Sequence, residues 1–208
     1  MTETVINDVL PDIPRIYTAV AEWLACLICI LEVKRRVQGW KLAGISMGVL
    51  IIQAGFLQMT AGAEGIWWMI CMAGAIAIMY AFLAICCDIS LKDTGYYCVR
   101  AFVTAECVAS LEWQLDCFGY FTLGWRHPVF RIGFLILTYG LGFLLTWLCY
   151  RKYENQEEEI LVTAKELISC VIIGLSVFLI SNLGFVSLTT PFSGTFPTEI
   201  FNVRTLVD

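Results

Sequence analysis

Residues 66–87 read IWWMICMAGAIAIMYAFLAICC and contain no charged side chain. An α-helix needs about 20 mostly apolar residues to cross the hydrocarbon core of a bilayer. A helix that is apolar on every side is buried either in a large protein core or in lipid. This stretch therefore predicts a membrane-spanning helix.

Five further stretches have comparable length and apolar character. They are residues 14–33, 40–61, 95–118, 129–150 and 161–188. Short polar connectors separate them, so the sequence predicts an all-α, polytopic transmembrane bundle of about six spans. Residues 199–208 carry apolar residues in the pattern of the first turns of a seventh helix, so residues 1–208 are expected to be the N-terminal membrane part of a longer protein. The first dozen residues are polar and lack a basic lead-in, so no cleavable signal peptide is expected.

The composition supports lipid as the solvent. Of the 208 residues, 59% are hydrophobic and 15% are charged, against about 45 to 50% and about 25% in soluble domains. The net charge of −5 comes largely from the acidic run 154–159, which is expected to be a solvated loop. Basic residues are scattered between apolar stretches, so the basic stripe of a nucleic-acid-binding protein is missing from the sequence.

The positions of lysine and arginine predict the orientation, because these residues favour the cytoplasmic side in short loops. Placing the first, third and fifth connectors inside puts most of the 13 basic residues on that side: Lys34, Arg35, Arg36, Lys41, Lys92, Arg100, Arg151, Lys152 and Lys165. Arg15, Arg126, Arg131 and Arg204 are left outside. The N-terminus is therefore expected outside the cell. Trp67, Trp68 and Trp125 then lie near the outer interface, where indole rings anchor a protein.

Ionisable groups at membrane depth are expected to face the bundle interior, because a central charge costs about 2.5 to 3.5 kcal/mol on insertion scales. Glu22 lies near the middle of the first predicted span and shares a helix face with Arg15, Thr18, Cys26 and Cys29. Together these residues predict one polar seam along the first helix.

The fourth predicted span is the most polar one. Glu106 lies near its centre and shares a face with Ser110 and Trp113, whereas Glu112 and Asp116 form an i, i+4 pair near the outer end. The candidate ligand-binding set is Glu22, Glu106, Ser110, Glu112, Trp113 and Asp116. Two carboxylates could attract a cation or a basic ligand group, or they could be solvated charges at a loop edge. Arg100 either extends to the inner surface or pairs within the bundle.

No cofactor, metal site or catalytic apparatus is expected in these residues. The spacing of Cys26 and Cys29 is CxxC, but a soft-metal site needs further thiolate or imidazole ligands, and the only histidine, His127, is elsewhere. Most of the ten cysteines lie in apolar stretches, which indicates packing and no disulfide. Phosphate-binding loops, GxSxG and HExxH are missing from the sequence.

Several stretches resemble the membrane region of sensor histidine kinases with a GHKL-type ATP-binding domain from gut Firmicutes. They are 87–90 (CDIS) leading into 95–102 (GYYCVRAF), 105–106 (AE) followed by 109–115 (ASLEWQL), 14–17 (PRIY) and 200–208 (IFNVRTLVD). The resemblance covers nearly the whole chain. It implies a final span, a phosphoacceptor histidine and an ATPase domain beyond residue 208, and a homodimer in the bacterial plasma membrane. None of these stretches is a catalytic motif, so no functional residue is carried over.

Two functions remain in competition. The leading hypothesis is the input module of a two-component system, in which a peptide or small molecule at the outer face or within the bundle shifts helix packing. The alternative is a transport or substrate-capture subunit with Glu22 and Glu106 along a solute or proton path, since buried ionisable residues are typical of transporters. A third possibility is a structural subunit that packs against other membrane proteins.

Overall fold

The structure is a computed structural model that describes residues 14–63, 65–121, 127–154 and 162–181. These residues form six helices: α1 (Arg15–Glu32), α2 (Trp40–Met59), α3 (Gly65–Cys86), α4 (Leu91–Phe121), α5 (Pro128–Glu154) and α6 (Ala164–Ser181). No strand occurs within the described ranges, where Arg35 and Cys87 form an isolated β-bridge. The prediction of an all-α fold is confirmed.

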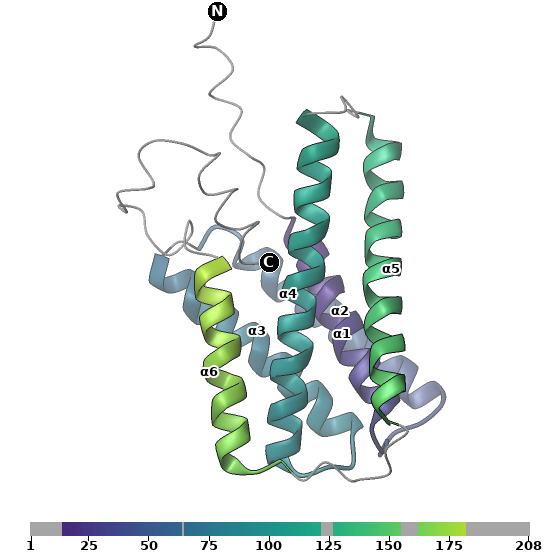
Figure 1. Cartoon of the computed structure of the whole chain (residues 1–208), viewed down its shortest axis with the longest axis vertical. Helices are drawn as coiled ribbons and strands as arrows, with labels where there is room; N and C mark the ends of the chain where they lie inside the picture. Colours follow the sequence, from purple (N-terminus) through teal and green to yellow (C-terminus); the bar gives the residue numbers. More distant parts are fainter. Residues whose placement is uncertain (1–13, 64, 122–126, 155–161, 182–208) are drawn as a thin grey trace, which may run out of the picture.

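The longest helix, α4, is the centre of the arrangement. It packs against α1, α3, α5 and α6, and α1 packs in turn against α2, α3 and α5. Figure 1 shows α4 between α5 and α6, with α1, α2 and α3 on the side away from the viewer. Side chains on α4 can therefore meet partners from four other helices.

Within the part of the chain that the structure describes, three helices are long and apolar enough to cross a membrane: Trp40–Met59, Trp67–Cys86 and Pro128–Arg151. Large apolar side chains point outward along α5, among them Phe130, Ile136 and Leu145, whereas Glu22 and Gln53 are buried inside. A soluble protein places its ionisable groups outward. The reverse distribution is typical of a protein surrounded by lipid.

The fourth helix begins four residues earlier than the predicted start at residue 95. Ser90 caps it, because the backbone N–H of Asp93 donates to Ser90 Oγ at 3.2 Å and Ser90 Oγ donates to Asp93 Oδ2 at 2.6 Å. A serine followed three residues later by an acid satisfies the first free N–H groups of a helix. Residues 91–94 therefore form the first turn of α4, and the prediction that they belong to the connector is wrong.

The first and third connectors meet at one end of the bundle. The Arg36 N–H donates to the Cys86 carbonyl and the Asp88 N–H donates to the Lys34 carbonyl, both at 2.8 Å. At the start of α6, the Val162 N–H donates to Asp93 Oδ1 at 3.2 Å. The start of the sixth helix thus lies at the same end as these two connectors.

Other predictions concern residues that the structure does not describe. The predicted end of the sixth span at residue 188 and the seventh helix lie outside the described residues, as do Trp125, most of the acidic run 154–159 and the first dozen residues.

Glycine allows α4 and α6 to approach each other closely. A Cβ atom added at Gly174 of α6 would lie 2.8 Å from Cγ1 of Val99 in α4, whereas a Cβ added at Gly140 of α5 would meet nothing within 4 Å. Small residues at helix contacts bring backbones together in membranes, where lipid supplies no hydrophobic driving force. The short α4–α6 distance therefore depends on Gly174.

Gly174→Ala is expected to lower the free energy of unfolding by about 1 kcal/mol or more, because the added methyl group overpacks the contact with Val99. Gly140→Ala is the matched control, and it is expected to be neutral or to stabilise the protein by up to about 1 kcal/mol through helix propensity. Unfolding of both variants in mixed detergent micelles measures the difference. Equal effects at the two positions would contradict the close contact.

Candidate functional site

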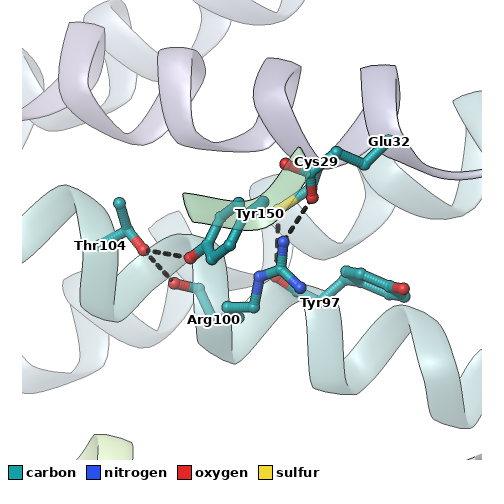
Figure 2. Close-up of polar contacts among 6 residues, drawn as sticks. All are labelled: Cys29, Glu32, Tyr97, Arg100, Thr104 and Tyr150. Carbon is teal, nitrogen blue, oxygen red and sulfur yellow. Dashed lines mark hydrogen bonds and ion pairs between the residues drawn. The ribbon is translucent and has the colours of Figure 1, made fainter. Parts of the chain in front are cut away.

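A polar cluster around Arg100 joins three helices. Arg100 of α4 forms an ion pair with Glu32 at the end of α1. Its guanidinium lies 3.5 Å from the ring centroid of Tyr150 in α5 and 5.2 Å from that of Tyr97. Figure 2 shows the guanidinium beside the Tyr150 ring, with a dashed line to the Glu32 carboxylate. The side chains of Arg100 and Glu32 are 21% and 9% exposed, so the pair is largely removed from solvent.

Glu32 needs this partner because of its position in α1. It lies in the last turn, where the helix dipole is negative and where no basic residue occurs. A carboxylate there is unfavourable, and the guanidinium offsets both the carboxylate and the helix end. The guanidinium of Arg100 therefore compensates an unfavourable negative charge at the C-terminal end of α1.

Two further hydrogen bonds hold the aromatic part of the cluster. The hydroxyls of Thr104 and Tyr150 are 3.1 Å apart, and Thr104 also donates to the Arg100 carbonyl at 2.9 Å. The Cys29 thiol lies 3.8 Å from the Tyr97 carbonyl (Figure 2). A shift of α1 or α5 relative to α4 would break the ion pair or the ring contact.

A second polar contact lies deeper between α1 and α2. Gln53 donates from Nε2 to Glu22 Oε2 and lies 3.4 Å from the Ala75 carbonyl of α3. Glu22 is 0% exposed and Gln53 is 1% exposed. The prediction that Glu22 and its seam face the interior is confirmed for Glu22, Thr18, Cys26 and Cys29, which are all buried; Arg15 is half-buried.

Glu106 is half-buried on α4 and lies within electrostatic range of Glu22. Ser110 and Trp113, predicted to share its face, are both buried. Tyr139 of α5 donates from its hydroxyl to the Tyr17 carbonyl of α1 at 3.0 Å. Glu22 of α1, Glu106 of α4 and Tyr139 of α5 thus lie within electrostatic range of one another.

A third polar contact lies at the end of α4 opposite to the Arg100 cluster. These three groups of polar residues are called the polar layers below. Arg131 of α5 binds Asp116 through both carboxylate oxygens, at 3.0 Å to Oδ1 and 2.6 Å to Oδ2. Asp116 therefore has a basic partner within the chain itself, Arg131. Glu112, one turn away, is buried, so its interpretation as a solvated charge at a loop edge is wrong. The reason is that α5 covers this part of α4.

The structure also tests the two alternatives for Arg100 and the prediction that Trp67 and Trp68 are interfacial anchors. Arg100 pairs within the bundle and does not extend to the surface as a solvated group. Trp67 is 69% exposed, as expected of an interfacial anchor, but Trp68 is 4% exposed and stacks on Phe178 of α6 at 5.1 Å between ring centroids. The anchor prediction for Trp68 is wrong because α6 covers that side of α3.

Sequence reasoning missed three residues of these layers: Glu32, Gln53 and Tyr150. Glu32 had a usable signal, since an acid in the last turn of a helix with no base nearby requires an external cation. Gln53 is uncharged and is one of several polar residues in its span, with Ser46 and Gln58, and Tyr150 has the position of an ordinary interfacial aromatic residue. Neither of these two had a signal that separated it from its neighbours.

Nine of the ten cysteines have described side chains, and Cys26, Cys29, Cys71, Cys86, Cys87, Cys98, Cys149 and Cys170 among them are free thiols. Cys26, Cys29 and Cys98 are buried as expected of packing residues, but Cys107 and Cys149 face outward. Over the described ranges, no group of three or more His, Cys, Asp or Glu side chains is arranged to hold a metal ion.

Comparison with known proteins gives no assignment. No family model, curated protein or solved structure matches the chain. The polar layers therefore have to be interpreted from their own chemistry.

Proposed function

We propose that this chain is the membrane-embedded input region of a signalling protein, and that the Arg100 cluster transmits helix movement within it. The observation that supports this function is the convergence of α1, α4 and α5 on Arg100 through one ion pair and one ring contact. Such a junction can adopt alternative pairings when one helix moves. A ligand that favours one arrangement then shifts the population toward it.

The location of the Arg100 cluster supports the same role in transmitting helix movement. The cluster contains the last residue of α1, and the paired first and third connectors follow at that end of the bundle. A movement at the Asp116–Arg131 end of α4 and α5 reaches this junction along the same two helices. In the proposal, the signal is a peptide or small molecule that contacts Glu106, Ser110, Glu112, Trp113 or Asp116.

The parent protein in this proposal is a homodimeric GHKL-type histidine kinase of the bacterial plasma membrane. Its membrane region has six spans and a seventh leading to the kinase, with the N-terminus outside. The resemblance of the sequence stretches supports it, as do three described helices that are long and apolar enough to cross a membrane. Extending the reading frame beyond codon 208 tests it first, because the kinase requires a phosphoacceptor histidine and an ATP-binding domain there.

If the frame encodes that domain, Arg100→Gln is expected to change autophosphorylation of the full-length protein in membrane vesicles by at least about fivefold, the size of a 1 kcal/mol coupling. Arg36→Gln, which removes an exposed ion pair at the same end, is the control with little expected change. An unchanged rate in a correctly folded Arg100 variant would argue against transmission through this cluster.

The proposed orientation predicts opposite reporter results at two connectors. Alkaline phosphatase fused after Ala63 is expected to be active, because this connector lies outside, and a fusion after Gln38 is expected to be inactive. A green fluorescent protein is expected to give the reverse pattern at the same two positions. The opposite outcome would place the N-terminus in the cytoplasm.

The second candidate is a transport or substrate-capture subunit. Glu22 favours it, since this acid is fully buried near Glu106, and ionisable residues in that position are typical of ion pathways. A reading frame that stops at codon 208, together with solute uptake by proteoliposomes that Glu22→Gln abolishes, would favour this candidate over the signalling role.

A further inference from the structure

Glu22 and Gln53, which contact each other, each leave one buried oxygen atom without a hydrogen-bond donor. The Gln53 amide donates to Glu22 Oε2, but Glu22 Oε1 and Gln53 Oε1 have no hydrogen-bond partner although both are fully buried. Buried polar atoms are nearly always satisfied in native proteins, and each exception requires an explanation. Two unsatisfied acceptors on neighbouring side chains indicate that a positively charged or donating species belongs between the helices.

The chain supplies no base for Glu22 among its described residues. The ion pairs there involve Glu32, Asp88 and Asp116 as acids, and Glu22 takes part in none of them. Arg100 and Arg131 are each bound to another carboxylate, and the half-buried Arg15, two turns before Glu22 on α1, forms no ion pair with it. An isolated carboxylate inside a protein is relieved by pairing, by a bound cation or by a proton.

We propose that Glu22 and Gln53 form a buried binding site for one monovalent cation, either a proton or a sodium ion. A proton on Glu22 Oε1 would convert an unsatisfied acceptor into a donor. A sodium ion would take carboxylate and amide oxygens as ligands, as hard cations do. The site is independent of the signalling role, because it follows from burial and hydrogen bonding alone.

Occupation of this site is expected to stabilise the packing of three helices. Glu22 belongs to α1, Gln53 to α2, and the Gln53 amide also approaches the Ala75 carbonyl of α3. Other titratable groups face Glu22 from its own helix, from α4 and from α5: Cys26, Cys98, Glu106 and Tyr139. None of these groups can carry a positive charge, so none of them neutralises an ionised Glu22.

The test is the melting temperature (Tm) of the purified chain in lipid nanodiscs. Sodium chloride is replaced stepwise by N-methyl-D-glucamine chloride at constant ionic strength, and the pH is varied separately. For sodium, a tenfold excess over the dissociation constant is expected to raise the Tm by about 3 to 6 °C. For a proton, the Tm is insensitive to sodium and falls as the pH is raised, because Glu22 then loses the proton that satisfies it.

Glu22→Gln is expected to abolish either dependence while keeping the shape of the side chain. Glu166→Gln, at the exposed start of α6, is the control that leaves the dependence in place. A wild-type response identical to that of Glu22→Gln would overturn the proposal.

If Glu22→Gln does not fold, Gln53→Glu tests the same site from the other helix. A second carboxylate is expected to increase the Tm response to the cation at least twofold. An unchanged response in Gln53→Glu would also overturn the proposal.

Discussion

Arg100→Gln is expected to lower the free energy of unfolding by about 3 kcal/mol, because it removes the cation beside a largely buried carboxylate. The same change removes the contact of the guanidinium with the Tyr150 ring. It also leaves the negative charge of Glu32 uncompensated at the negative end of the α1 dipole. Unfolding in mixed detergent micelles measures the loss. Arg36→Gln, whose partner Asp88 is half exposed, is expected to cost less than about 1 kcal/mol.

A double-mutant cycle separates the ion pair from the other contacts of Arg100. Glu32→Gln combined with Arg100→Gln is expected to cost less than the sum of the two single changes, by about 1 to 3 kcal/mol. That difference is the coupling between the two side chains. Strict additivity would contradict the ion pair, whatever the size of the single effects.

Phe178→Ala is expected to lower the free energy of unfolding by about 3 kcal/mol, because it removes an aromatic ring from the contact of α6 with α3 and α4. The Phe178 ring lies 5.1 Å from that of Trp68 and 5.3 Å from that of Phe102, between centroids. Leu175→Ala on the outer face of the same helix is the control, since Leu175 is exposed. It is expected to cost less than about 1 kcal/mol.

The loss at Phe178 is expected to concentrate in α6, which packs mainly against α4. Hydrogen exchange should therefore increase over residues 164–181 before it increases over α1. Equal losses of stability for Phe178→Ala and Leu175→Ala would show that α6 is not held through its inner aromatic face.

The positions of the helices followed from local sequence. Each apolar run produced a helix near the predicted place, because length and apolar character act within one segment. The largest difference at a helix start was in α4, where Ser90 and Asp93 form a cap that the apolar run does not contain. The inward position of Glu22 was also predictable, since the cost of exposing an acid to lipid depends only on its depth.

The partners of the polar groups were not predictable in the same way. Arg100 and Glu32 are 68 residues apart in the chain, and several acids near the apolar spans were equally available to Arg100 by sequence. The same holds for Trp68, whose burial depends on Phe178 of α6, and for Glu112, whose burial depends on the position of α5.

For the described residues, the sequence by itself therefore determined a set of helices with apolar outer faces and the inward position of Glu22. Hydrocarbon and backbone hydrogen bonding impose these features on each segment separately. Only the tertiary structure decided which acid meets which base, and that Glu22 binds an amide while Arg100 binds Glu32. Pairing depends on the rotation and depth of helices relative to one another, and close packing sets both.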